Sequence, residues 1–224
     1  MNFTFEANSR GATNRSQNHD LIIFDQSAQG NFFAYPFTDN PAASRAFDDA
    51  ELARRNLSRN DFNFHVGDAK AINLQGFINF GYKISAKTEV YASTGFSVRN
   101  GTGYGFRRLP SESQNVVASI FPNGFQPTLN SSINDFSLIT GIKQQLGDWN
   151  LDFSNTFGRN SFGYTVKNSN NSSLGSKSPT QFDAGSHSFA QNTVNADISR
   201  TVKAGTKIIN LAFTVRLISA FTVF

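Results

Sequence analysis

Residues 72 to 84 read Ile72-Asn-Leu-Gln-Gly-Phe-Ile-Asn-Phe-Gly-Tyr-Lys-Ile84, and this stretch decides the fold. One set of alternate positions is apolar: Ile72, Leu74, Ile78, Phe80, Tyr82 and Ile84, with Gly76 among them. The other set holds Asn73, Gln75, Asn79 and Lys83, with Phe77 as an exception. Successive side chains of a strand point to opposite faces, so the stretch predicts a strand with one apolar and one polar face.

The same alternation returns along the chain. After a tight turn at Ser85–Thr88, the apolar residues Val90, Ala92, Phe96 and Val98 alternate with polar ones, although Tyr91 joins the polar set. Two further pairs of alternating segments turn at Gly147-Asp148 and around Ala204-Gly205. We expect strands near residues 2–8, 71–84, 89–99, 133–146, 149–159, 190–202 and 207–217. These ranges have seven to fourteen residues, around the nine to twelve that cross a membrane at a tilt.

The connections alternate between short and long. The long ones, residues 9–69, 100–132 and 160–189, are rich in Asn, Ser, Gly and Pro. Outer-membrane barrels combine short periplasmic turns with long extracellular loops, whereas soluble sandwiches have shorter and more even loops. The pattern predicts an all-β, antiparallel up-and-down meander that forms part of a transmembrane β-barrel. Single-chain bacterial barrels usually have an even number of at least eight strands, so we expect partner strands from outside this sequence.

Composition excludes several other classes. Only 16% of the 224 residues are charged, and 24 are Phe. The net charge of +4 is scattered rather than gathered in a basic patch, which argues against a nucleic-acid partner. The chain has no cysteine, so disulfide scaffolds and thiol chemistry are excluded. Ile208–Phe224 is the most apolar stretch, but it contains Asn210 and Arg216 and is too short for a membrane helix.

Several residues are candidates for specific positions on a barrel. Phe80, Tyr82 and Trp149 lie close to the short turns, where an aromatic girdle meets the periplasmic interface. In a soluble sheet they would pack at the end of a core. The charged residues of the polar faces would point into the lumen, or into solvent in a sandwich: Lys83, Glu89, Arg99, Asp152 and Asp197.

No pattern predicts catalysis, a cofactor or a metal. His19, His65 and His187 have no second ligand at metal spacing. The glycines of Gly101–Gly105 lack the Lys and the following helix of a phosphate loop. Ser44–Arg55 has a helical pattern, and we expect its Asp48, Asp49 and Glu51 to lie on a solvated loop helix. The chain is therefore predicted not to be an enzyme.

Four segments carry a resemblance to a known family. Residues 95–110, Ile120–Pro127, Asp148–Phe162 and Asn171–Gly185 resemble strand-to-loop passages of TonB-dependent outer-membrane receptors, in the family's order and spacing. The resemblance covers about residues 1 to 213. It implies a 22-stranded barrel around a plug domain, with TonB as the energy-coupling partner. It also implies a scarce nutrient as ligand: an iron chelate, cobalamin or an oligosaccharide.

The family's plug lies ahead of its barrel, and no plug segment resembles any part of this sequence. The N-terminus also lacks the pattern of a signal peptide. After Phe213 the likeness lapses, so we expect an incomplete receptor with an altered C-terminal end. Within the outward-facing loops, Arg107, Arg108, Phe121 and Phe125 are the candidate ligand contacts, because arginine holds anionic groups and aromatic rings stack on planar ones. The alternative for these four residues is that they only order the loop.

Two other functions are compatible with the pattern. A passive outer-membrane barrel, such as a porin or an adhesin, would show the same strands without energy coupling. A soluble all-β binding module would have to cover the apolar faces, which are otherwise sticky. An open sheet leaves two unpaired edges, so the isolated chain is predicted to aggregate.

Overall fold

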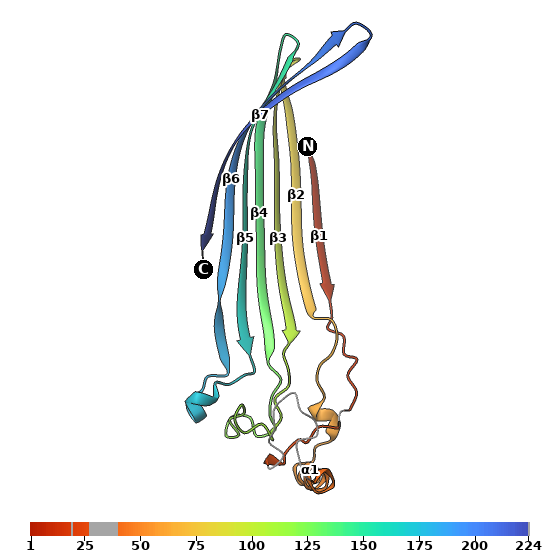
Figure 1. Cartoon of the computed structure of the whole chain (residues 1–224), viewed down its shortest axis with the longest axis vertical. Coiled ribbons are helices and arrows are strands. Elements are labelled where there is room, and N and C mark those ends of the chain that lie inside the picture. The colour runs from red at the N-terminus through yellow and green to blue at the C-terminus, as the bar shows by residue number, and fades with distance from the viewer. Residues whose placement is uncertain (19, 27–39, 224) are drawn as a thin grey trace.

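The computed structural model describes residues 1–18, 20–26 and 40–223, and its main feature is a single seven-stranded antiparallel sheet (Figure 1). The strands follow one another in chain order, which confirms the predicted all-β meander. Their bounds are β1 (Asn2–Arg10), β2 (Lys70–Ser85), β3 (Thr88–Tyr104), β4 (Thr128–Leu146), β5 (Trp149–Lys167), β6 (Gln181–Ala204) and β7 (Lys207–Val223). The described connections contain the helix α1 (Pro41–Arg55) and the 3-10 helices η2 (Arg59–Phe62) and η3 (Ser172–Lys177).

Short turns and long connections lie at opposite ends of the sheet (Figure 1). Tight turns join β2 to β3, β4 to β5 and β6 to β7 at what we call the turn end. Gly147 and Gly205 provide two of these turns with φ of 58° and 64°, a conformation that glycine adopts without steric cost. The long connections gather at the other end, the loop end, together with α1.

The strands are longer at the loop end than the sequence predicts. β3 continues to Tyr104 and pairs there with the start of β4 at Thr128, and β5 continues to Lys167 beside Gln181 of β6. These extensions are rich in Asn, Ser, Thr and Gly, so side-chain alternation gives no signal. Backbone hydrogen bonds between neighbouring strands do not require alternation, and they extend the sheet beyond the apolar segments. β7 likewise continues to Val223 rather than ending at 217.

The register separates the side chains into two faces. Direct partners on neighbouring strands share a face, so Tyr82, Val90, Ile142 and Phe153 form one continuous row. The apolar face consists mainly of such residues: Phe3, Phe5, Ile72, Leu74, Ile78, Phe80, Tyr82, Val90, Phe96, Val98, Phe136, Leu138, Ile142, Leu151, Phe153, Phe157, Val194, Ile198, Phe213, Val215 and Leu217. Many of them are exposed, with Leu217 at 68%. Amides, hydroxyls and charged groups dominate the opposite, polar face.

On β7 the apolar residues of this face continue toward the loop end to Phe221 and Val223, whereas from β2 to β6 they form an oblique band. Its loop-side border is marked by Ile72, Val98, Phe136, Phe157 and Val194 on β2 to β6. The border moves toward the turn end by two residues from each strand to the next. For example, Ile72 pairs with Asn100 of β3, but the border residue of β3 is Val98, two residues nearer the turn end. Two polar groups inside the band have partners within the sheet: Thr94 donates to the Ser137 carbonyl at 2.9 Å, and Asn155 donates to Asn192 at 3.0 Å.

The turns are displaced in the same direction as the band. Thr88, beside the first turn, aligns through β4 and β5 with Ile198 of β6. The second turn follows Leu146, two residues beyond Gln144, the member of that row on β4. The third turn follows Ala204, six residues beyond Ile198. Six residues of about 3.4 Å across four strand spacings of about 4.8 Å correspond to a tilt of about 45° if all turns lie at one level. Strands of membrane barrels tilt by about this amount.

The sheet is open within the described residues. β1 and β7 are its two edges and do not pair with each other. Both run from the turn end toward the loop end (Figure 1). No helix in the described part of the chain is long and apolar enough to span a membrane.

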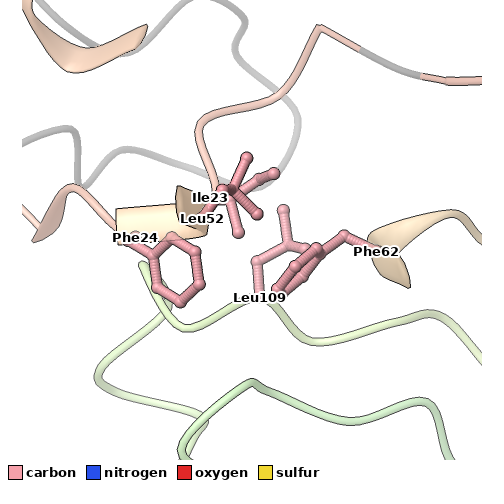
Figure 2. Close-up of a cluster of buried hydrophobic side chains, with 5 residues drawn as sticks. All are labelled: Ile23, Phe24, Leu52, Phe62 and Leu109. Carbon is pink, nitrogen blue, oxygen red and sulfur yellow. The ribbon is translucent and has the colours of Figure 1, made fainter. Parts of the chain in front are cut away.

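A small hydrophobic core lies outside the sheet, at the loop end. Ile23, Phe24, Leu52, Phe62 and Leu109 pack together there (Figure 2). The Phe24 and Phe62 rings meet edge-on with centroids 5.3 Å apart. These residues come from the β1–β2 connection and the β3–β4 connection. The two connections therefore fold against each other into one unit, which we call the loop cluster.

Candidate functional site

The polar face carries a row of charged residues across the sheet near the turn end. Register partners link Lys83 to Glu89, Glu89 to Lys143, Lys143 to Asp152 and Asp152 to Asp197. Four of the five predicted lumen-facing residues therefore share one row of the polar face. A hollow of about 500 Å³ opens beside them. Within the described residues these opposed side chains form no direct ion pair, so their charges remain available to other groups.

Tyr91 connects two members of this row. Its hydroxyl donates to Asp152 Oδ1 at 2.8 Å, and the Lys143 ammonium lies 4.9 Å from its ring centroid. The ring covers Gly141, its direct partner on β4, where even a methyl group would collide with it. At the other end of the row, the Thr214 hydroxyl donates to Asp197 at 2.6 Å.

Arg99, the fifth predicted lumen-facing residue, lies on the same face but closer to the loop end. Its Nε donates to Asn73 Oδ1 at 2.8 Å, and the Asn73 amide donates in turn to Asn8 at 2.6 Å. Side-chain hydrogen bonds of this kind join neighbouring strands across the polar face, and they hold its amides in fixed orientations.

A larger hollow of about 640 Å³ occupies the middle of the polar face. Its lining includes two glycines and two exposed phenylalanines whose positions belong to the polar face: Gly95, Gly158, Phe77 and Phe189. Carboxylates and amides surround these rings. The Gln75 amide donates to Glu6 at 2.8 Å, and the Asn160 amide donates to Asp135 at 2.6 Å. The volume of the hollow lies in the range of small-molecule binding sites.

The three predicted girdle residues lie on the apolar face. Phe80 and Tyr82 are exposed, at 44% and 61%. Trp149 directly follows the β4–β5 turn, and the Arg200 guanidinium lies 5.5 Å from its ring centroid. Arg200 also pairs with Asp148 of that turn at 2.8 Å. The tryptophan is therefore anchored at the turn end by a charged group, while Phe80 and Tyr82 lie farther along the strands.

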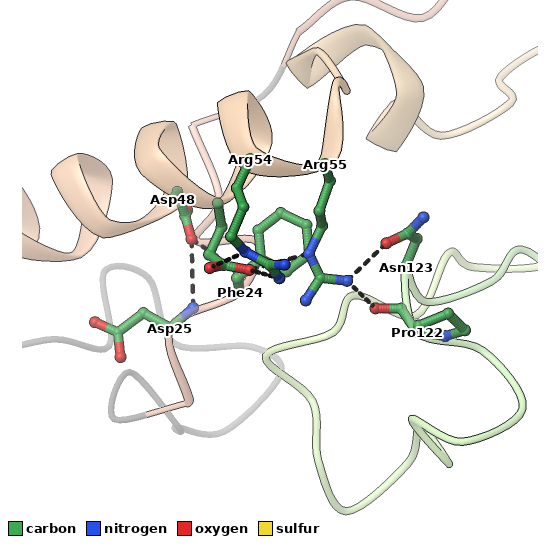
Figure 3. Close-up of polar contacts among 8 residues, drawn as sticks. Phe24, Asp25, Asp48, Arg54, Arg55, Pro122 and Asn123 are labelled. Carbon is green, nitrogen blue, oxygen red and sulfur yellow. Dashed lines mark hydrogen bonds and ion pairs between the residues drawn. The ribbon is translucent and has the colours of Figure 1, made fainter.

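Asp48 organises the loop cluster. Its buried carboxylate accepts a hydrogen bond from the backbone N–H of Ile23 at 2.7 Å. It also accepts from the backbone N–H groups of Phe24 at 2.7 Å and Asp25 at 3.3 Å (Figure 3). This corrects the expectation that Asp48 lies on a solvated helix. The sequence predicts the helix itself, and α1 is present, but α1 buries the face that carries Ser44, Asp48 and Leu52.

The last turn of α1 connects the two parts of the loop cluster. Arg55 pairs with Glu51 at 3.0 Å, contacts the Phe24 ring at 4.6 Å, and donates to the Pro122 carbonyl and the Asn123 side chain (Figure 3). Hydrogen bonds from Arg54, then from Arg55, lower the pKa of Glu51 from 4.5 to about 2. Glu51 is thus ionised at any ordinary pH and holds Arg55 in place.

The four predicted ligand contacts lie close together in the loop cluster. Arg108 and Phe125 exchange two backbone hydrogen bonds, of 2.6 and 2.9 Å, and Phe121 packs on Phe125 with ring centroids 4.6 Å apart. Phe125 is buried and Arg108 pairs with Glu112 at 3.3 Å. These contacts favour the alternative in which both residues order the loop.

Arg107 differs from the other three predicted contacts. Its guanidinium lies over the Phe62 ring at 5.1 Å and is half-buried. Burial lowers the pKa of Arg107, and nearby Asp61 opposes that shift. Within the described residues, its buried Nε has no hydrogen-bond partner. Arg107 therefore remains the member of the set with unused hydrogen-bonding capacity.

The described histidines do not gather at a metal site. His65 stacks on Tyr104 at 3.8 Å, and His187 stacks on Phe162 at 5.4 Å. His19 lies outside the described residues. In the described part of the chain, no group of three or more His, Cys, Asp or Glu residues could hold a metal ion.

No family model matches this sequence, and no match was found among curated proteins or among solved structures.

Sequence reasoning missed Lys143 and Tyr91 in the charged row, and Phe77 and Phe189 in the central hollow. A signal for two of them was present, because Phe77 and Tyr91 break the alternation by placing a large ring on the polar side. Alternation also places Lys143 on the polar face, but its neighbours in the charged row, like the position of Phe189 beside the hollow, were known only from the register. Their importance depends on which residues lie beside them on other strands.

Proposed function

We propose that this chain forms part of the wall of a transmembrane β-barrel in a bacterial outer membrane, in a receptor of the TonB-dependent class that takes up a scarce nutrient. The observation that carries the proposal is the oblique apolar band. Its border and the turns are displaced in the same direction from strand to strand. Such a coincidence is expected where tilted strands cross an apolar layer of fixed height.

The dimensions of the band support lipid as its partner. Its apolar positions run from Val90 to Val98 on β3 and from Ile72 to Ile84 on β2. At a rise of about 3.4 Å per residue and a tilt of about 45°, these lengths correspond to heights of about 20 to 30 Å. Membrane barrels have an apolar band about 25 Å tall. In the described part of the chain neither a helix nor a second sheet packs on this face.

The polar face supports an interior role. Opposed charges and hydrogen-bonded amides suit a lumen filled by water or by a polar domain. The charged row could hold such a domain through Glu89, Lys143 and Asp197, whose charges form no ion pair within the described residues. On this proposal a plug domain contacts the inside of the wall at the charged row, and TonB couples it to energy.

The loop cluster favours a receptor over a passive barrel. Two long connections share the core of Figure 2, and Asn170 of the β5–β6 connection exchanges hydrogen bonds with residues 115 and 117 of the β3–β4 connection. Three connections are thus tied together at the loop end. A loop assembly of this kind can present residues such as Arg107 to an extracellular ligand. The resemblance of the loops to TonB-dependent receptors supports the same choice.

Nitroxide labels can test the membrane placement. The full chain, refolded into lipid vesicles, would carry single labels at the border residues Val98, Phe136 and Phe157. Matched labels would replace their polar neighbours Asn100, Asn134 and Arg159, two residues nearer the loop end on the same strands. We expect oxygen, which partitions into lipid, to relax the first set, and a water-soluble nickel complex to relax the second.

Three outcomes of the labelling are informative. If the boundary between oxygen-accessible and nickel-accessible positions shifts by two residues from each strand to the next, the result supports the proposal. Equal access of the nickel complex to both sets would contradict lipid contact and favour a soluble binding module. A steady ion conductance of the reconstituted chain in a planar bilayer would favour the passive barrel.

A further inference from the structure

Aromatic rings lie in sequence along the polar face, where water or a polar partner is expected. Near the loop end, Phe162 contacts Tyr164 with centroids 4.4 Å apart and stacks on His187 of β6. Phe189 follows two residues farther along β6 and borders the central hollow, and Phe77 of β2 borders its other side. Phe77 and Phe189 are 42% and 44% exposed. A large apolar ring on a polar, hollowed face points to a ligand that covers it.

The floor between Phe77 and Phe189 is flat because glycines and small hydroxyl residues form it. Gly158 has open space above it, since an added Cβ would meet no atom within 4 Å. Phe77 leans over Gly95, where an added Cβ would lie 3.0 Å from its ring. The two rings are four strands apart, which corresponds to about 19 Å along the sheet. An extended ligand rather than a compact one can reach both.

The polar groups of the hollow select the chemistry of that ligand. Two carboxylates, Glu6 and Asp135, project from the polar face, whereas Arg159 belongs to the apolar face by its pairing with Phe136. An anionic chelate would meet two like charges here. Amides and hydroxyls of Gln75, Asn160 and Thr193 can instead donate to and accept from hydroxyl groups.

We propose that the polar face contains a binding path for a neutral, linear oligosaccharide, which runs from Tyr164 past Phe189 to Phe77. Apolar faces of sugar rings would stack on the exposed phenylalanines, and their hydroxyls would bond to the surrounding amides and carboxylates. This inference rests on the proposed function and selects one of its three nutrient classes.

Calorimetric titration of the full chain in detergent micelles tests the path, with maltohexaose, cellohexaose and xylohexaose as probes. We expect one of them to bind. Phe77→Ala and Phe189→Ala should each weaken that binding about three- to tenfold, the range expected for loss of one aromatic contact. Gly158→Gln should weaken it further, because the new side chain occupies the floor, where its Cβ meets no atom within 4 Å.

A matched control comes from the apolar face. Phe153→Ala removes a phenylalanine that is even more exposed, at 55%, and should leave sugar binding unchanged. Absence of binding by all three sugars, or equal losses in Phe153→Ala and Phe189→Ala, would overturn the path. Binding of a ferric catecholate that Gly158→Gln abolishes would overturn the neutral ligand class. The labelling experiment tests the proposed function separately. Sugar binding without lipid contact would reject the membrane barrel but not the binding path. Lipid contact without sugar binding would reject the binding path but not the barrel.

Discussion

Asp48 shows how far the order of the loop end depends on one side chain. Its carboxylate is fully buried and satisfies backbone N–H groups at the start of the Ile23–Asp25 segment. A buried donor without a partner costs the full desolvation free energy of that group. The same carboxylate also ties α1 to a segment more than twenty residues away, so its loss would separate the two.

Asp48→Ala should release residues 20–25 from α1. We expect a loss of about 2 to 4 kcal/mol in the local stability of the loop cluster, because buried N–H groups lose a charged acceptor. Limited proteolysis and amide exchange of Ile23 and Phe24 measure this. Asp49→Ala, an exposed neighbour on the same helix, is the control. Unchanged protection of Ile23 in Asp48→Ala would contradict the assignment.

Glu51 predicts a pH dependence of the loop cluster. Its pKa is lowered on folding, from 4.5 to about 2, by Arg54 and Arg55. A lowered pKa means that the stabilisation is complete above about pH 4.5 and is lost as the pH falls through about 2. NMR titration of the Glu51 carboxyl should show this pKa, and the Arg55 contact with Phe24 should weaken over the same range. Glu51→Gln should remove the dependence, and a Glu51 pKa near 4.5 would contradict it.

At the scale of elements, the Arg108–Phe125 bridge closes the β3–β4 connection around a glycine. Gly124 has φ of 66°, and a Cβ there would collide with the Arg108 carbonyl oxygen. Gly175 in η3 has a similar φ of 55° but open space around it. Alanine substitutions at Gly124 and Gly175 therefore separate two free-energy costs, that of the backbone conformation and that of the collision.

Gly124→Ala should break both backbone hydrogen bonds of the bridge and destabilise the connection by about 2 to 4 kcal/mol, whereas Gly175→Ala should cost about 1 kcal/mol. Amide exchange at Arg108 and Phe125 reports on the bridge. Equal exchange rates in the two variants would show that the collision is relieved by movement of the chain.

The two faces of β4 allow a direct test of the band. Leu138 lies in the middle of the apolar face, and Ser137 next to it lies on the polar face. In lipid vesicles Leu138→Lys should lower the free energy of unfolding by about 2 to 4 kcal/mol, because a lysine there enters the apolar layer. Ser137→Lys should have little effect. Denaturant unfolding of both variants measures the difference, and equal stabilities would argue against membrane contact.

At the scale of the whole molecule, strand direction limits how the sheet can close. β1 and β7 run in the same direction, so direct pairing between them would be parallel. An antiparallel wall therefore closes only if an odd number of further strands lies between these edges. Without such strands both edges expose unpaired backbone groups, which supports the prediction that the isolated chain aggregates.

The open form has a measurable width. Phe5 and Phe221 lie at opposite ends of one row that passes through Phe96. Six strand spacings give about 29 Å along the sheet, and curvature shortens the direct distance somewhat. Electron–electron distance measurement between labels at Phe5 and Phe221 should give about 20 to 30 Å, against about 19 Å or less for the control pair Phe96 and Phe221. A distance near 10 Å would mean that the edges meet.

The sequence by itself determined the strands, their two faces and the short turns, because alternation and turn chemistry are local properties. Residues 72–84 suffice to assign Ile78 and Asn79 to opposite faces. The tertiary structure alone decided the register, and with it the oblique band, the charged row and the positions of the aromatic rings on the polar face. It also decided the burial of Asp48 and Phe125 in the loop cluster. These features depend on which residues lie side by side on separate strands or loops, and no pattern along a single segment records that.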